Sequence, residues 1–115
     1  MSYVECYVAA VPNENEDAYK QKCTTMCNVF KDHGALRAAD CWGISVPEGD
    51  VTSFPKAVQA GEDETVVLGW VEWPSKEVRD EAMPKAMSDE RMQMSDMPFD
   101  GKRLIFAGFE MFNDV

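Results

Sequence analysis

The sequence lacks any apolar run long enough to cross a membrane. A spanning helix needs about 20 consecutive apolar residues, and no such stretch occurs in the 115 residues. The opening residues, MSYVEC, also lack the basic head and long apolar segment of a secretory signal. We therefore expect a cytoplasmic protein that does not associate with membranes.

Positive charge is scarce as well. The chain has 11 Lys and Arg against 21 Asp and Glu, which gives a formal net charge of −10. A surface of this sign repels the phosphates of a nucleic-acid backbone, so we expect no nucleic-acid partner. A cationic partner is one interpretation of the charge, and solubility is the simpler one.

Residue types that bind metals are few. There is one histidine, His33, and the four cysteines contain no Cys-x-x-Cys pair. Cys23 and Cys27 lie four residues apart on a predicted helix, but they also fall on its apolar stripe, where thiols behave as small hydrophobes. We predict four free thiols, no metal site and no cofactor, with haem as the alternative cofactor. The glycine patterns of phosphate loops and nucleophile elbows are absent too.

What the sequence contains is the pattern of one small α+β domain, residues 1–115. With 45% hydrophobic residues, a chain of this length buries a single core. Alternating and helical periodicities predict strands over 3–11, 35–44, 64–73 and 102–112, and helices over 13–33 and from Ser75 onward, with a kink or early end at Pro84. The order β-α-β-β-α-β is that of a ferredoxin-like fold, an antiparallel four-stranded sheet with two helices on one face.

One sheet face is therefore left uncovered by helices, and strand alternation assigns residues to each side. We assign to the helix side Val4, Cys6, Val8, Ala39, Cys41, Val67, Gly69, Val71, Ile105, Ala107 and Phe109. The opposite face then carries Glu5, Tyr7, Asp40, Trp42, Leu68, Trp70, Glu72, Phe106 and Glu110. So much aromatic area is unfavourable in water, so we predict a homodimer in which two such faces meet.

Four segments resemble the signature of a known family: HGALRAADCWG (33–43), VPEGDVTSFPKAV (46–58), ETVVLGWVEWPSKEVRD (64–80) and MPFDGKRLIFAGFE (97–110). It is a family of small bacterial proteins known only as a domain of unknown function within the dimeric α/β-barrel superfamily. The resemblance covers nearly the whole chain and implies a ferredoxin-like subunit whose sheet joins a second subunit's to form a barrel. It brings no catalytic residues, and Pro84, Cys23 and Cys27 depart from its pattern.

Two functions remain open. In the first, a small apolar or aromatic molecule is bound or transformed in a barrel pocket without a metal. The candidate acid–base residues are then Asp40, Glu72 and His33, and the candidate ligand-binding residues are Tyr7, Trp42, Phe54 and Trp70. In the second, the same aromatics form a solid interface in a non-catalytic homodimer. The connection of about twenty residues between the second and third strands is a lid in the first case and a clasp on the partner in the second.

Overall fold

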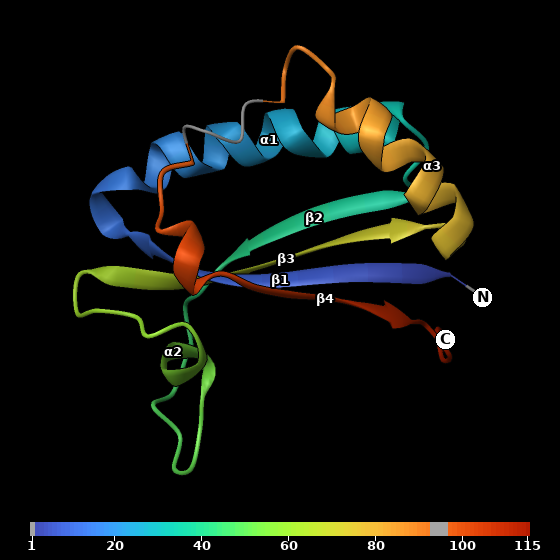
Figure 1. Cartoon of the computed structure of the whole chain (residues 1–115). Helices are drawn as coiled ribbons and strands as arrows, with labels where there is room; N and C mark the ends of the chain where they lie inside the picture. Colours follow the sequence, from blue (N-terminus) through green and yellow to red (C-terminus); the bar gives the residue numbers. More distant parts are fainter. Residues whose placement is uncertain (1, 93–96) are drawn as a thin grey trace.

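The computed structural model describes residues 2–92 and 97–115 as one layer of strands with helices packed on it (Figure 1). The sheet is four-stranded and antiparallel, in the order β2-β3-β1-β4. The strands are β1 (Tyr3–Pro12), β2 (Arg37–Trp42), β3 (Glu64–Trp73) and β4 (Ile105–Glu110), and the helices are α1 (Glu16–Asp32), α2 (Phe54–Ala57) and α3 (Lys76–Met87). The α+β class is confirmed, and the arrangement is compatible with a ferredoxin-like fold. Within the described ranges, every helix is too short or too polar to cross a bilayer.

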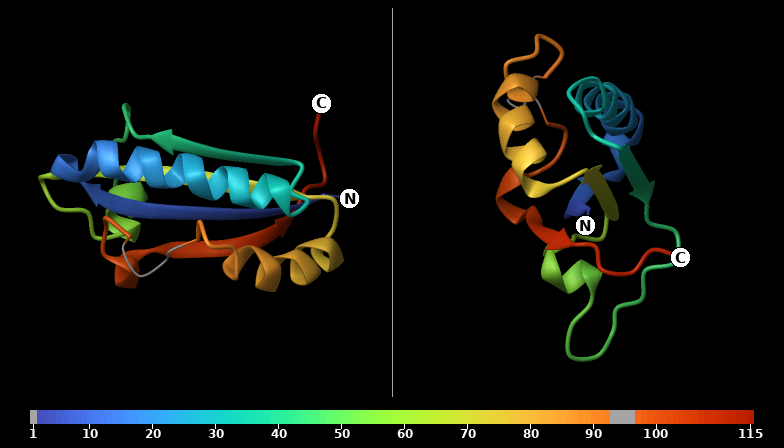
Figure 2. Two further views of the ribbon diagram at one scale, coloured as in Figure 1. Left: turned by 90° about the horizontal axis from the view of Figure 1, so that it is seen from above. Right: turned by 90° about the vertical axis from the view of Figure 1, so that its right-hand side faces the viewer.

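The two long helices lie side by side on one face of the sheet. Figure 2 shows α1 nearer β2 and α3 nearer β4. Helix α1 buries Tyr19, Cys23 and Val29 and ends before Gly34, whose φ of 112° suits glycine. Helix α3 begins after Ser75, whose side chain accepts a hydrogen bond from the backbone N–H of Val78. Pro84 lies in the last turn of α3, and the helix continues beyond it to Met87.

Strand pairing fixes which residues share a sheet face. Tyr7 and Asp40 both lie opposite Gly69, one from each neighbouring strand. Trp42 is on the same side of β2 as Asp40 and packs against Tyr19 of α1, so this face lies beneath the helices. The sides predicted for β3 are therefore right, but those predicted for the other strands are reversed. Toward the helices point Glu5, Tyr7, Asp40, Trp42, Phe106 and Glu110, and away from them point Val4, Cys6, Val8, Ala39, Cys41, Ile105, Ala107 and Phe109.

The reversal has a simple physical cause in β1, whose second half is apolar on both sides. Ala9 and Val11 are buried beneath the helices, whereas Val8 and Ala10 are buried on the second face. Alternation shows which residues of a strand point the same way, but only packing decides which side meets the helices. When both sides are apolar, the sequence pattern favours neither.

The connection between β2 and β3 covers part of the second face. Val58, just after α2, is fully buried in a cluster with Val8 and Ala10 of β1 and Val66 of β3. Figure 1 shows that this segment lies on the side of the sheet opposite α1 and α3. The expectation that one subunit has no means of covering this face is therefore wrong for the end of the sheet nearest α2.

Candidate functional site

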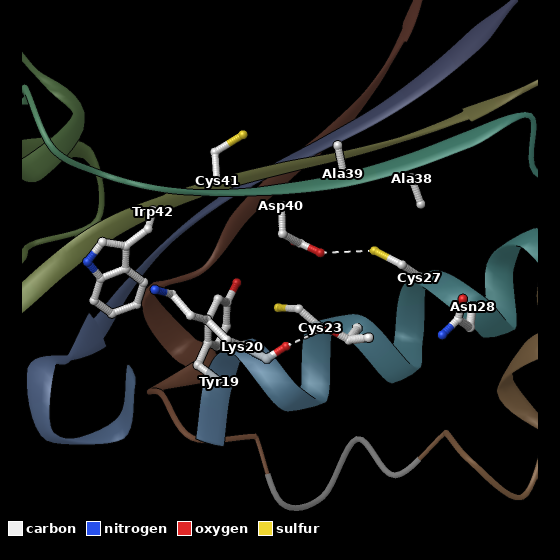
Figure 3. A pocket seen from close by; sticks show the side chains of 11 residues that line it. Tyr19, Lys20, Cys23, Cys27, Asn28, Ala38, Ala39, Asp40, Cys41 and Trp42 are labelled. Carbon is white, nitrogen blue, oxygen red and sulfur yellow. Dashed lines mark hydrogen bonds between the residues drawn. The ribbon is translucent and has the colours of Figure 1, made fainter. Parts of the chain in front are cut away.

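A groove of about 390 Å3 lies between α1 and β2, the edge strand beside it. The residues of β2 that face α1 are Ala38, Asp40 and Trp42, so a small and a polar side chain lie beside one large ring. Figure 3 shows the residues that line it: Tyr19, Lys20, Cys23, Thr24, Cys27 and Asn28 from α1, and Ala38, Ala39, Asp40, Cys41 and Trp42 from β2.

Asp40 is the carboxyl group of the groove. The Cys27 thiol donates a hydrogen bond to Asp40 Oδ2 over 3.1 Å (Figure 3). Asp40 Oδ1 is buried, and among the described residues it has no hydrogen-bond partner. Burial of this carboxyl disfavours its charged form and raises the pKa of Asp40 from 3.8 to about 6. Asp40 therefore exchanges its proton close to neutral pH, as an acid–base group must.

Gly69 of β3 provides space beneath this carboxyl. A methyl group added at Gly69 would lie 2.2 Å from the Tyr7 hydroxyl oxygen and 2.5 Å from Asp40 Oδ1. Both oxygens therefore sit over the Cα atom of Gly69, where no larger residue fits. Tyr7 thus lies next to Asp40 on the same sheet face, although it does not line the groove itself.

Aromatic rings form one end of the groove. The rings of Tyr19 and Trp42 have centroids 6.4 Å apart at an angle of 52°, and Tyr19 also meets Phe99 edge-on at 5.8 Å. The Lys20 ammonium lies 5.3 Å from the centroid of the Trp42 ring, within range for a cation–π contact. It also pairs with Glu16 over 2.5 Å, one turn earlier in α1. This end of the groove thus offers an aromatic face beside a cation.

The two thiols that α1 contributes to the groove, Cys23 and Cys27, are not activated. Burial raises the pKa of both Cys23 and Cys27, so they remain protonated, whereas a nucleophilic cysteine needs a lowered pKa. All four cysteines are free, as predicted. In the part of the chain that the structure describes, no three His, Cys, Asp or Glu side chains converge as a metal site.

The structure brings together only part of the predicted site. Asp40 and Trp42 line the groove, and Tyr7 is next to Asp40. Trp70 and Glu72 lie on the opposite sheet face, which the register assigns together with Cys6 and Val4.

Two further candidates lie well away from the groove. Phe54 belongs to α2, on the far side of the sheet (Figure 1). His33 follows α1, and its Nε2 lies 3.2 Å from Asp89 Oδ2. Of the predicted site residues, only Asp40 and Trp42 line the groove, and His33 and Phe54 lie elsewhere in the subunit.

Sequence reasoning missed the contribution of α1 to the site. Cys23 and Cys27 were assigned to the apolar stripe of the helix, but both of them also line the groove, together with Tyr19. The spacing of Lys20, Thr24 and Asn28 at intervals of four is the available signal, because it marks the polar edge of that stripe on one side of the helix.

Comparison with known proteins identifies the family of this chain, which is a family of unknown function. The model of a protein family of unknown function, DUF1428, matches residues 2–101. The chain belongs to this family. It is 51% identical over 116 residues to the uncharacterised protein YbaA of Escherichia coli K12, covering 99% of each chain. The same identity and coverage hold for the YbaA proteins of Escherichia coli O157:H7 and Shigella flexneri.

Proposed function

We propose that the protein binds a small apolar or aromatic molecule in the groove between α1 and β2. The observation that carries this proposal is a carboxyl group, Asp40, which lies in a groove with an aromatic end and forms no salt bridge with any described residue. Pockets that bind small molecules combine apolar walls with a few polar groups in this way, and a shifted pKa in a cleft favours a functional role.

If the bound molecule is transformed, the reaction is a proton transfer in which Asp40 is the acid–base group. The raised pKa of Asp40 suits proton exchange near neutral pH. The thiols of Cys23 and Cys27 are held in their protonated form, which disfavours a covalent mechanism through sulfur.

The proposed binding needs neither a metal nor haem. His33, the one histidine of the sequence, lies beside Asp89 at the end of α1 and does not line the groove. The polar groups of the groove are a carboxyl, thiols, a hydroxyl, an amide and an ammonium, which suit an organic molecule that makes hydrogen bonds and apolar contacts.

Two neighbouring threonines give a matched test of this proposal. Thr24 and Thr25 each donate a side-chain hydrogen bond to the carbonyl four residues earlier, but only Thr24 lines the groove. Thr24→Phe fills the groove, whereas Thr25→Phe adds the same bulk outside it. Binding of phenyl compounds with a two-carbon chain ending in an alcohol, an amine or a carboxylate is measured by NMR titration.

The proposal predicts that at least one of these probes binds the wild-type chain and Thr25→Phe with millimolar or better affinity. Binding to Thr24→Phe should be at least tenfold weaker. Equal binding to both variants would place the ligand elsewhere, and no binding of any probe to the wild-type chain would refute the proposal.

We propose in addition that the protein is a cytoplasmic homodimer, in which the second sheet faces of two copies meet. Phe109 and Ile105 of β4 are 55% and 44% exposed on that face, and Ile44 and Val51 of the long connection are 92% and 93% exposed. Apolar side chains exposed in this number favour a covering partner. The resemblance to dimeric α/β barrels agrees with this arrangement, and four unpaired thiols suit a reducing compartment.

The mass of the particle in solution tests the dimer independently of the groove. Light scattering after gel filtration should give twice the chain mass at micromolar concentration. Phe109→Glu puts a charge into the proposed interface and should give monomers, whereas Phe112→Glu, beyond the end of β4, serves as the control. A monomeric wild-type chain would contradict the dimer and leave the groove proposal unaffected.

A further inference from the structure

The chemical class of the ligand follows from the charges around the groove. Asp40 is faced by the thiols of Cys23 and Cys27 and by Lys20 from α1, by the hydroxyl of Tyr7 from β1, and by Gly69 from β3. Among these groups Lys20 is the only cation, and its ammonium is directed to Glu16 and to the Trp42 ring. In the described part of the chain, Asp40 forms no salt bridge.

The hydrogen bond that Asp40 does receive is a weak one. A thiol is a poor donor compared with an ammonium or amide N–H, and a hydrogen bond from a charged donor to a carboxylate is about twice as strong as a neutral one. Cys27 itself lines the groove beside Asp40. If a ligand ammonium replaces the thiol as the donor to Asp40 Oδ2, the new hydrogen bond is therefore stronger than the one that is lost.

The aromatic end of the groove already holds an ammonium. Lys20 lies over the Trp42 ring, which shows that a positively charged nitrogen is accommodated there. The Lys20 side chain is 54% exposed and its partner Glu16 is 40% exposed. Exposed pairs of this kind contribute little to stability, so Lys20 is free to move away when another cation arrives.

The charge of the whole protein acts in the same direction. With a formal net charge of −10, the protein raises the local concentration of cations and lowers that of anions. An anionic ligand would gain the contact with Lys20, but it would be repelled by the net negative charge of the protein and by the Asp40 carboxylate.

We infer that the ligand of the groove is a small organic cation, an amine joined to an aromatic ring by a short chain. Its ammonium binds Asp40, and its ring packs against Trp42 and Tyr19. This inference rests on the proposed function, and it adds the charge of the ligand and the residue that recognises it. Lys20 then competes with the ligand for the same aromatic face.

Three probes of equal shape and different charge test the inference: 2-phenylethylamine, 2-phenylethanol and phenylacetate. The amine should bind the wild-type chain at least tenfold more tightly than the alcohol, and phenylacetate should bind most weakly. Asp40→Asn should remove the advantage of the amine over the alcohol while the alcohol still binds. Because the ammonium requires an ionised partner, affinity for the amine should fall as the pH drops below about 6, near the pKa of Asp40.

The effect of Lys20→Met on affinity should distinguish a cationic ligand from an anionic one. It keeps most of the apolar stem and removes the competing ammonium, so it should strengthen binding of 2-phenylethylamine. If the ligand is an anion held by Lys20, the same substitution weakens binding of phenylacetate.

The outcomes separate the inference from the proposed function. Binding of the alcohol or phenylacetate as tight as that of the amine refutes the organic cation but leaves the groove as a binding site. Binding of the amine that is unchanged in Asp40→Asn refutes the role of Asp40 in recognition. Failure of all three probes to bind refutes both proposals.

Discussion

The Cys27 thiol donates a hydrogen bond of 3.1 Å to Asp40 Oδ2 and so joins helix α1 to the edge strand β2 across the floor of a groove. This contact links two residues that are thirteen positions apart and belong to different layers of the fold. It places a carboxyl group where water is partly excluded, and among the described residues this group forms no salt bridge.

Asp40→Asn should stabilise the protein at neutral pH. Since the pKa of Asp40 is raised from 3.8 to about 6 in the folded protein, the unfolded chain ionises this group first as the pH rises. Below pH 3.8 both states are protonated, between the two values stability falls as the pH rises, and above 6 the loss is constant. With allowance for solvent screening, asparagine should recover about 1 kcal/mol at pH 7.

The measurement is the free energy of unfolding in urea at several pH values from 4 to 8. The difference between Asp40→Asn and the wild-type chain isolates this group, because all other ionisable residues are common to both proteins. A difference that stays constant over the whole range would show that Asp40 ionises normally in the folded state.

Substitutions of Cys27 should move the pKa of Asp40 in opposite directions. A donor to the carboxylate favours its ionised form, and a hydroxyl is a stronger donor than a thiol. Cys27→Ser should therefore lower the pKa of Asp40, and Cys27→Ala should raise it. The titration of the Asp40 carboxyl carbon, followed by NMR, reports this directly. Shifts of the same sign in both variants would mean that the thiol does not act as a donor.

Gly69→Ala should destabilise the protein by about 1–3 kcal/mol, because overpacking beneath a helix forces neighbouring groups to move. The added methyl group would lie 2.2 Å from the hydroxyl oxygen of Tyr7 and 2.5 Å from Asp40 Oδ1. Gly101→Ala is the control, since nothing lies within 4 Å of the same added group, and its effect should stay within about 0.5 kcal/mol. Equal unfolding free energies for the two variants would exclude the close approach of Tyr7 and Asp40 to this strand.

Arg103 should hold the long connection against the sheet. Its guanidinium donates to both carboxylate oxygens of Glu64 over 2.7 Å and to the carbonyl of Gln59 over 2.8 Å. Arg103→Met removes these bonds at the end of the connection. Trypsin cleavage after Lys56, followed by mass spectrometry, should therefore become faster.

The neighbouring residue provides a matched control for that experiment. Lys102→Met also removes one trypsin site, but in the described part of the chain the Lys102 side chain forms no salt bridge. Cleavage after Lys56 should keep its wild-type rate in Lys102→Met. The same increase in both variants would mean that Arg103 has no special role in fixing the connection.

Most of the fold could be predicted from the sequence, because the periodicities are strong. The first long helix ends close to residue 33 and the second begins at Ser75, as their residue types predicted. The orientation of strands β1, β2 and β4 could not be predicted in the same way. These strands are apolar on both sides or short, and the packing of a distant segment decides which side each one buries.

The candidate site could be predicted only in its parts. Asp40 and Trp42 were identified as a carboxyl group beside an aromatic residue, and they do lie together in the groove. The other side chains of the groove come from α1. Trp70 and Glu72 do not contribute, because the side of β2 that carries Asp40 faces the helices. A site between a helix and a strand depends on which side of the strand faces the helix. Pairing with other strands determines that side, and the sequence of one segment alone does not reveal it.

The most direct measurement is a map of backbone amide shifts in the NMR spectrum when 2-phenylethylamine and 2-phenylethanol are added in turn. Binding in the groove should move the signals of residues 19–28 and 38–42 and leave those of 105–109 unchanged. Signals that move only in 105–109, or in no part of the chain with either compound, would contradict the assignment of the groove between α1 and β2 as the binding site.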